Sequence, residues 1–530
     1  MNNKKEQERA ELHKTIWKIA NELRGSVDGW DFKQYVLGLL FYRFISENIE
    51  NYVNENQRKA GITNFQYRNI SDEEALLGKS QILDEKGFFI LPSELFCNIR
   101  KGADKNENLN VVISNVFNNI ESSARGSASE DDVKGLFDDF TIDNKLGNTV
   151  DERNEKLVKL LNSIGDLSFG DYEDNNIDLF GDAYEFLMTM YASSAGKSGG
   201  EFFTPQEVGE LLARIVIQDK TSVNKVYDPA CGSGGMFVQS LKFIENHQGN
   251  VRNISIYGQE KNPTTWKLAK MNLAIRSIDG DLGKFAADTF HEDLHKDLKA
   301  DYILANPPFN ISDWGQEKLL DDYRWKYGVP PKGNANYAWL QHMVSKLSVN
   351  GKAAIVLANG SLSAGGQEAE IRKNLIENDL VDCIIAMPSN LFYTVTIPCS
   401  IWILNRNKKQ KGKTLFINAS NLGTMVTRKL RELYDEDINE ISSTYHNYQN
   451  NTNYNDILGF CKKSSIDEIK LSDYVLTPGR YVGTEVVLDD DIPFEEKMKK
   501  ITKELSKQFE ESHVLEEEIK SNLKSIGFEI

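Results

Sequence analysis

The sequence predicts an α/β fold: a doubly wound, Rossmann-like core of seven strands, with a helical N-terminal domain before it and a helical C-terminal tail after it. Two features predict the core. Short apolar runs alternate with helical segments over residues 225–404, and a glycine-rich turn follows the first of these runs. Helical spacing of apolar residues predicts the two flanking regions. We therefore expect domains at residues 1–165, 166–485 and 486–530.

Apolar residues at helical spacing predict the N-terminal domain. Residues 32–49 form an amphipathic pattern, and a shorter pattern precedes it at Leu12, Ile16, Ile19 and Leu23. Polar, Asn-rich segments separate further helical stretches up to about residue 164, and no long β-branched run interrupts them. This composition predicts an all-helical domain.

The core is expected to alternate strands with crossover helices. The predicted strands are Lys225–Tyr227, Ser255–Gly258, Lys284–Ala287, Tyr302–Ala305, Ala353–Leu357, Cys383–Ala386 and Ser400–Leu404. The predicted helices are Leu179–Tyr191, Met236–Asn246, Pro263–Arg276, Tyr337–Leu347 and Gln367–Asn378. Because most successive strands are separated by a helix, we expect a mostly parallel sheet.

Three segments lie outside this alternation. The basic run Lys408–Lys413 follows the last predicted strand and is expected to form a solvated turn. Residues 425–449 show no pattern that predicts one element. From Pro493 the composition is strongly charged, with one apolar helical face comprising Ile501, Leu505, Phe509, Leu515, Ile519 and Leu523. This face predicts a long terminal helix that packs on a partner or back on its own chain.

The net charge bears on possible partners. Lys and Arg total 62 against 79 Asp and Glu, which gives a formal net charge of −17. Proteins that bind DNA unaided usually present a basic surface, because phosphate neutralisation supplies most of the non-specific affinity. If this protein acts on DNA, another chain is therefore expected to supply most of the binding. A protein that never contacts nucleic acid is also compatible with this charge.

Cysteine and histidine usage predicts neither disulfides nor a metal site. The five cysteines are scattered and never spaced as CxxC, so we expect reduced thiols. The few histidines show no ligand spacing. No apolar run is long enough to span a bilayer, and the first twenty residues lack the apolar centre of a signal peptide. These features together predict a cytoplasmic protein.

A glycine-rich turn, Asp228–Gly235 (DPACGSGG), follows the first predicted strand and opens a helix. In open parallel sheets, ligands bind at the carboxyl ends of strands, where glycines allow close backbone approach. The spacing differs from the dinucleotide pattern GxGxxG, which disfavours a pyrophosphate ligand. Glu260 is placed to accept both ribose hydroxyls of a nucleoside, and Asp288 to accept from an adenine amine. The predicted nucleoside site comprises Asp228, Gly232, Ser233, Gly234, Gly235, Glu260 and Asp288.

The fourth predicted strand ends in Asn306-Pro307-Pro308-Phe309. The Asn306 side-chain oxygen and the Pro307 carbonyl can accept both hydrogens of a planar amine, which favours a pyramidal nitrogen able to attack a sulfonium methyl group. The prolines restrict φ and hold these acceptors rigid. Phe309 offers a flat face on which an extruded base can stack. The tetrapeptide therefore predicts methyl transfer to an exocyclic amine, without a metal or a covalent nucleophile.

The two motifs DPACGSGG and NPPF resemble those of N6-adenine DNA methyltransferases, which use S-adenosylmethionine. The upstream block Gly199–Pro205 (GGEFFTP) is similar to a cofactor-binding loop of the modification (methyltransferase, M) subunits of type I restriction-modification systems. The resemblance implies that Tyr337–His342 and Gly351–Asn359 line the base and cofactor sites and that Leu471–Val482 closes the core. It also implies that the methionine part of the cofactor is contacted by Glu201, Phe202, Phe203, Thr204, Pro205 and Gln206.

The resemblance covers nearly the whole chain and implies an assembly. Type I modification subunits pair with a separate specificity subunit, typically two to one, and that subunit reads a two-part site in double-stranded DNA. The modification subunits methylate one adenine in each strand by base flipping, which protects host DNA from a restriction subunit. Dependence on a specificity subunit would account for the net charge of −17. The tail beyond Pro493 is the segment expected to dock on it.

Two alternatives remain open at this point. A methyltransferase acting on a protein glutamine amide or an RNA guanine amine would also use NPP with an aromatic residue. The GGEFFTP block and the two flanking helical regions argue against that alternative. A subunit that keeps the fold only for assembly has no physical need for Asn306, Phe309 and Glu260 together. The target sequence and the preference for hemimethylated or unmethylated DNA are not encoded in any motif of this chain.

Overall fold

In a computed structural model, the chain separates into two compact units, Met1–Val482 and Gly483–Ile530. The structure describes residues 10–19, 29–127, 129–138, 140, 142, 145–167, 183, 186, 204–217, 225–246, 254–275, 278–392, 397–427, 430–483 and 494–525. Nearly all of the predicted helix Leu179–Tyr191 lies outside the described residues, as do Glu201, Phe202 and Phe203 of the predicted cofactor loop.

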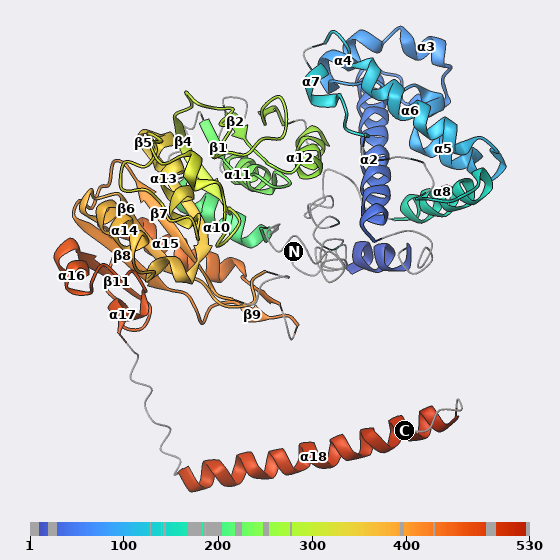
Figure 1. The fold of residues 1–530 in the computed structure, drawn as a ribbon. Coiled ribbons are helices and arrows are strands. Elements are labelled where there is room, and N and C mark those ends of the chain that lie inside the picture. The colour runs from blue at the N-terminus through green and yellow to red at the C-terminus, as the bar shows by residue number, and fades with distance from the viewer. Residues whose placement is uncertain are drawn as a thin grey trace. The chain divides into compact units, whose positions relative to one another are not determined.

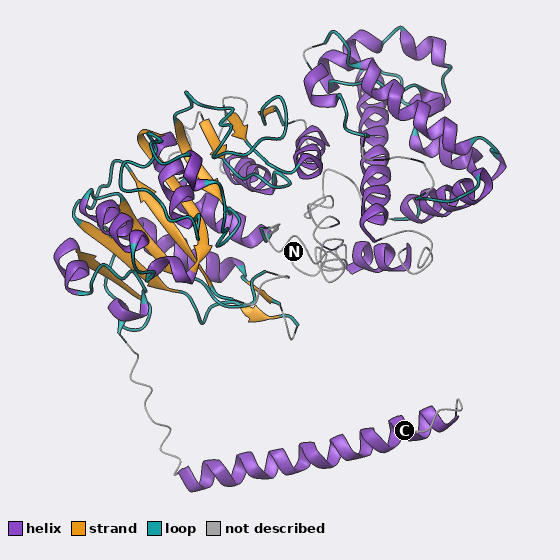
Figure 2. Cartoon of the chain, viewed as in Figure 1, coloured by secondary structure: helices purple, strands orange, loops and turns teal. Residues whose placement is uncertain are grey.

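The N-terminal part of the chain is helical, as predicted (Figures 1 and 2). After a helical segment over residues 10–19, its α-helices are α2 (Gly29–Lys59), α3 (Asp72–Leu76), α4 (Lys79–Lys86), α5 (Phe96–Gly102), α6 (Leu109–Ser123), α7 (Glu130–Val133) and α8 (Val150–Gly165). Helix α8 illustrates the local cause: the Thr149 side chain accepts from the Glu152 N–H at its start. Its apolar residues Leu157, Leu160, Leu161 and Ile164 recur at helical spacing and are buried.

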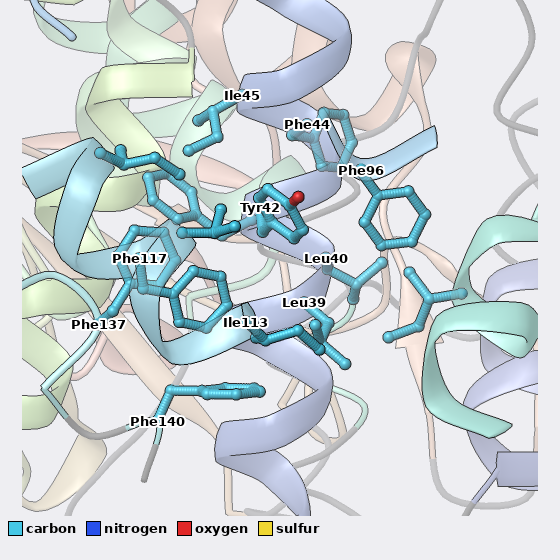
Figure 3. Close-up of a cluster of buried hydrophobic side chains, with 14 of the residues drawn as sticks. Leu39, Leu40, Tyr42, Phe44, Ile45, Phe96, Ile113, Phe117, Phe137 and Phe140 are labelled. Atoms are coloured by element: carbon cyan, nitrogen blue, oxygen red, sulfur yellow. The ribbon is translucent and has the colours of Figure 1, made fainter. Parts of the chain in front are cut away.

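Aromatic packing around α2 forms the core of this helical part (Figure 3). Tyr42 of α2 packs edge-on against Phe96 and Phe117, and Phe117 stacks on Phe137 with ring centroids 4.0 Å apart. Such aromatic pairs contribute about 0.5–1.5 kcal/mol each beyond the area they bury. The helical pattern of residues 32–49 therefore identified one face of a genuine core.

The core sheet has nine strands among the described residues, not the seven predicted, in the order β11-β8-β6-β7-β5-β4-β1-β2-β3. The strands are β1 (Lys225–Asp228), β2 (Ser255–Gly258), β3 (Gly280–Asp281), β4 (Ala300–Ala305), β5 (Leu347–Ala358), β6 (Val381–Ala386), β7 (Cys399–Asn405), β8 (Lys413–Asn418) and β11 (Cys461–Ser465). The predicted strand Lys284–Ala287 is wrong. Gly283, with φ of +77°, turns the chain away after β3, and Phe285 is exposed rather than buried.

The strand order places a topological switch point beside β1. Strands β1, β2 and β3 run outward in sequence, and the chain then returns to place β4 on the other side of β1, with β5 next. These five strands are parallel, whereas β7 runs antiparallel to β5 and β6. The carboxyl ends of β1, β2 and β4 therefore meet at one edge, where ligands bind in open α/β sheets.

Both faces of the sheet are buried, which confirms the doubly wound class. Successive residues of β4 alternate between two apolar clusters: Ile303 and Ala305 belong to one and Leu304 to the other. Helices α10 (Gln206–Val216), α11 (Gly235–Asn246), α12 (Pro263–Ile275) and α15 (Asp435–Asn450) cover one face. Helices α13 (Asn336–Lys346), α14 (Gln367–Glu377), α16 (Ile466–Leu471) and α17 (Gly479–Val482) cover the other.

Two segments differ from expectation or were not predicted. Lys408 of the basic run is buried rather than solvated, because its ammonium pairs with Asp379 at 2.5 Å and donates to the Val381 carbonyl. Within residues 425–449, β9 (Thr424–Met425) pairs antiparallel with β10 (Arg431–Glu432), and helix α15 begins at Asp435.

The second unit contains one long helix, α18 (Phe494–Ser525). Its apolar side chains are exposed where the structure describes them, at Met498, Leu505, Phe509, Leu515 and Ile519. Within the described residues, no helix has the length and apolarity needed to cross a membrane. All five cysteines of the chain are free thiols.

Candidate active site

The glycine-rich turn connects β1 to α11 at the switch point. Gly232 and Gly234 have φ of +55° and +80°, a region that L side chains rarely adopt, and the Gly234 N–H donates to the Cys231 carbonyl at 2.8 Å. A Cβ added at Gly232 or Gly235 would meet no described atom within 4 Å. The turn therefore presents bare backbone to open space, which is what close approach of a ligand requires.

Glu260 binds the turn directly. One carboxylate oxygen accepts from the Gly232 N–H at 3.1 Å and the other from the Asn262 N–H at 2.8 Å. The Glu260 carbonyl accepts from the Ala287 N–H at 2.9 Å, which fixes the segment leading to Asp288. Glu260 therefore places a carboxylate, the group predicted to accept from the hydroxyls of a ribose, against the backbone of the turn.

Asp288 is held as an anion beside Lys261. Its carboxylate pairs with the Lys261 ammonium at 2.8 Å and accepts from the Phe290 N–H at 2.9 Å. Burial by itself would raise the pKa of Asp288, but the hydrogen bond and charge of Lys261 outweigh burial, and the pKa is lowered. A carboxylate in this state accepts hydrogen bonds and does not donate them.

Asp228, at the end of β1, is in the opposite condition. Asp228 is 1% exposed, and this burial raises the pKa of its carboxyl to about 8. The hydrogen bond from the Ala230 N–H lowers the pKa, and the charge of Glu260 raises it further. The Asp228 carboxyl is therefore largely neutral near pH 7, when no ligand adds a charge beside it.

Asn306 directly follows β4. This strand neighbours β1 on the side opposite β2. Asn306 is 7% exposed, and its Nδ2 donates to Thr204 Oγ1 at 3.0 Å. Its Oδ1 is buried and has no hydrogen-bond partner among the described residues. Buried polar atoms are nearly always paired, so this acceptor, which has no partner among the described residues, is a candidate to receive a hydrogen bond from a ligand.

Phe309 follows Asn306 by three residues. Its side chain is half-buried and packs against the apolar cluster on the α10 face of the sheet. Its ring meets Phe392 edge-on, with centroids 6.1 Å apart and an angle of 84° between the planes. Pro307 is buried and Pro308 is partly buried. Phe392 was not predicted from the sequence, because 83 residues separate it from Phe309 and only the fold brings them together.

A pair of asparagines fixes the chain after NPPF. The Asn310 N–H donates to Asn336 Oδ1 at 3.0 Å, and Asn336 Nδ2 donates back to Asn310 Oδ1 at 2.8 Å. Asn310 has φ of +55°, a conformation that asparagine tolerates better than most residues. Sequence reasoning missed this pair; the one available signal was an asparagine immediately after a rigid Pro-Pro-Phe turn.

Of the segments expected to line the site, Tyr337–His342 includes buried, hydrogen-bonded side chains, whereas Gly351–Asn359 includes a buried acceptor without a partner among the described residues. Tyr337 and His342 are fully buried: the Tyr337 hydroxyl donates to the Ser361 carbonyl, and His342 lies between the Tyr227 hydroxyl and Arg324, at 3.1 Å from each. Burial, with the charges of Arg324 and Lys346, holds the pKa of His342 well below its usual value. In contrast, Asn359, after β5, has a buried Oδ1 without a partner among the described residues.

Three further residues predicted for the cofactor site, Ser233, Pro205 and Gln206, are buried. Ser233 is buried, and its carbonyl accepts from Asn272 Nδ2 at 2.8 Å, which ties the turn to α12. Pro205 and Gln206 are buried at the start of α10. Among the described residues, no group of three or more His, Cys, Asp or Glu is arranged to hold a metal ion.

Comparison with known proteins gives the family. Residues 175–490 match the family described as N-6 DNA Methylase, and residues 12–164 match the HsdM N-terminal domain. The HindI methylase subunit of Haemophilus influenzae is 52% identical over 353 residues, which are 66% of this chain and 79% of that protein. The MpnII methylase subunit of Mycoplasma pneumoniae is 40% identical over 506 residues, 92% of this chain and 91% of that protein.

A solved structure agrees. The methyltransferase subunit of a type I restriction-modification system from Streptococcus thermophilus superposes with a TM-score of 0.76 at 27% identity, covering 89% of this chain and 99% of that one. The chain therefore belongs to the N-6 DNA methylase family and is an adenine-specific DNA methyltransferase. Within that class it is a methylase subunit of a type I restriction-modification enzyme.

Proposed function

We propose that this subunit transfers the methyl group of S-adenosylmethionine to N6 of an adenine flipped out of duplex DNA, at a site read by a specificity subunit. The observation that carries the proposal is the buried Asn306 Oδ1, which has no hydrogen-bond partner in the described part of the chain and follows the strand beside the glycine-rich turn. The chemistry of the acceptor, the turn and the aromatic ring is consistent with methyl transfer to an amine.

The residues of the turn fit the proposed cofactor. Bare backbone at Gly232 and Gly235 leaves room for a ligand, and the Glu260 carboxylate lies against that backbone. Ser233, Gly234 and Asp228 belong to the same turn, and Asp288 adds an anionic acceptor for an adenine amine. The loop Glu201–Gln206 would hold the methionine part. When bound, S-adenosylmethionine supplies an electrophilic methyl group.

Asn306 would act on the target amine. The adenine N6 lone pair is delocalised into the ring, so the amine is a poor nucleophile. Accepting its hydrogens at Asn306 Oδ1 and at the Pro307 carbonyl favours the pyramidal geometry of the transition state more than the planar ground state. Both acceptors belong to a proline-restricted turn, so little reorganisation is needed when the substrate arrives.

Phe309 would bind the flipped base. Stacking of a base on an aromatic ring is worth about 1–3 kcal/mol, which offsets much of the cost of removing it from the duplex. Phe392 meets the edge of the Phe309 ring and limits its rotation. Pro308 stands between the acceptors and the ring and keeps their spacing fixed.

The subunit would act within an assembly. The relatives are named as subunits of type I restriction enzymes, and the net charge of −17 disfavours unaided binding of DNA. We assign docking on the helices of the specificity subunit to α18, whose exposed apolar residues need a partner surface; Phe509 is 66% exposed. Two copies per specificity subunit would place one methyltransferase on each strand of a two-part site, and a restriction subunit would complete the nuclease.

Product analysis tests the proposal. The purified subunit with its specificity subunit is incubated with S-adenosylmethionine and duplex DNA, and the digested nucleosides are separated by mass spectrometry. We expect N6-methyladenine as the methylated product and S-adenosylmethionine binding detectable by calorimetry. Methylation of another nucleoside, or no cofactor binding with the specificity subunit present, would contradict it.

A further inference from the structure

We propose that Thr204 is a positioning residue for Asn306: its hydroxyl accepts the amide N–H and thereby presents Oδ1 to the target amine. This inference rests on the proposed acceptor role of Asn306. It adds to Thr204 a function other than contact with the cofactor.

The amide of Asn306 can adopt two orientations that exchange its oxygen and nitrogen. Only one of them places an acceptor toward an amine; the other places the NH₂ group there, donor against donor. In the structure, Nδ2 donates to Thr204 Oγ1 at 3.0 Å and Oδ1 is the buried atom without a partner among the described residues. This is the orientation that adenine methylation requires.

The hydroxyl supports the productive orientation once the substrate is present. When Oδ1 accepts from the adenine amine, the amide NH₂ points the other way into a buried region, since Asn306 is 7% exposed. A buried donor without an acceptor costs about 1–3 kcal/mol, and Thr204 Oγ1 supplies that acceptor. Without the hydroxyl, the productive orientation leaves the amide NH₂ group without this acceptor.

Thr204 is itself firmly placed. It lies two residues before α10, and the inward residues of that helix, such as Leu211 and Leu212, are fully buried. A β-branched side chain also has few χ1 rotamers, which keeps Oγ1 in position. Because Thr204 belongs to the segment Glu201–Gln206, which is predicted to bind the methionine part, one short segment would couple cofactor binding to the orientation of the catalytic amide.

The test compares Thr204→Val, which removes the hydroxyl but keeps the shape, with Thr204→Ser, which keeps the hydroxyl. Methyl transfer to duplex DNA is measured with the full subunit and its specificity subunit at saturating S-adenosylmethionine, and cofactor affinity is measured by calorimetry. We expect Thr204→Val to lower kcat by about tenfold to a hundredfold, from the cost of an unpaired buried donor. A rise in its Kd for S-adenosylmethionine would reflect the predicted cofactor contact of Thr204 and does not lower kcat at saturation. We expect Thr204→Ser to recover most of kcat.

Matched controls separate the outcomes. Thr414→Val removes another buried hydroxyl, one that donates to the Val381 carbonyl at 2.9 Å far along the sheet, and kcat should be unchanged. Unchanged kcat in Thr204→Val, or a raised cofactor Kd with full kcat at saturation, would overturn the positioning role. Asn306→Ala distinguishes the two hypotheses: if that variant stays active, the acceptor role itself has failed, whatever Thr204 does.

Discussion

At the scale of single residues, the site combines groups whose protonation is set by their surroundings. Asp288 is paired with Lys261 and remains ionised, whereas Asp228 is buried beside β2 without a cation and has its pKa raised to about 8. Two carboxyl groups near one turn therefore carry different charges near neutral pH. The sequence places Asp228 at the end of a strand, but the strand predicted just before Asp288 does not form there. The sequence also gives neither the burial of the two carboxyl groups nor the position of Lys261.

The raised pKa of Asp228 predicts a pH dependence of stability. The folded state keeps the proton up to about pH 8, while the unfolded carboxyl loses it near pH 4. Protonation of Asp228 thus stabilises the fold fully below about pH 4, and this contribution is lost as pH rises toward 8. Asp228→Asn keeps an acceptor for the Ala230 N–H and does not titrate.

We therefore expect the free energy of unfolding of the wild type to fall more steeply with pH than that of Asp228→Asn. The difference between their slopes should approach, but not exceed, about 1.4 kcal/mol per pH unit between about pH 5 and pH 7. Urea unfolding at several pH values measures both slopes. Parallel curves for the two proteins would show that Asp228 is ionised in the folded state.

The residues of NPPF and of the glycine-rich turn could be placed from the sequence because each is continuous in the chain and follows a recognisable strand. Thr204 could be named, but not its bond to Asn306, because 102 residues separate the two. The same holds for Phe392 beside Phe309. Contacts made by sheet order and loop packing have no signal at the level of local pattern.

At the scale of elements, α15 shows why part of the fold resisted prediction. Its sequence has few large aliphatic residues, and its buried face includes Ser442, Tyr445 and Gln449. The Tyr445 hydroxyl and Gln449 Nε2 both donate to Asp382 Oδ2 on β6, at 2.9 and 2.7 Å. Polar residues on an inward face hide the apolar periodicity on which helix prediction depends.

Asp382 is therefore predicted to hold α15 to the sheet. Its Oδ2 also accepts from Asn405 on β7, so Asp382→Ala leaves three buried donors without their acceptor. We expect the free energy of unfolding to fall by about 3 kcal/mol or more. Thermal or urea unfolding measures the loss, and Glu440→Ala, on the exposed face of α15, serves as the control with a change within about 0.5 kcal/mol. Equal stability of the two variants would contradict this role.

Local sequence patterns also misled the prediction of two strands, one predicted at residues 284–287 that does not form and one, β8, that was not predicted. Residues 284–287 carry an apolar run, but a glycine at positive φ precedes them and Phe285 faces outward. The run in β8, Leu415–Ile417, is too short to distinguish a buried strand from a turn of helix by periodicity. Five of the six correct strands adjoin a predicted helix in sequence, and the sixth, β7, is a longer and fully buried apolar run.

At the scale of the whole molecule, the chain divides after Val482. The buried clusters of the first unit contain no residue beyond Val482, so this unit has its own cores. The class of fold and the acidic charge followed from the sequence. The partner of the α18 stripe did not, because the pattern is compatible both with packing on another chain and with packing on the same chain.

Deleting residues from Pro493 onward is predicted to weaken pairing with the specificity subunit. The thermal unfolding of Met1–Val482 should be unchanged, since its clusters are complete without the tail. Calorimetric titration of one subunit into the other measures the affinity. A paired substitution refines the test: Phe509→Ser, on the apolar stripe, should weaken binding more than a change at the charged Glu510. Full affinity after deletion would exclude α18 as the docking segment.

The most direct measurement is methyl transfer by Asn306→Ala, assayed on duplex DNA with the specificity subunit present. Removing one preorganised group that stabilises a transition state typically costs a factor of about 10² to 10³ in rate. We predict a loss of at least about a hundredfold, with cofactor affinity and assembly within about twofold of the wild type. Activity within about tenfold of the wild type would contradict the role of Asn306 Oδ1 as the acceptor of the adenine amine.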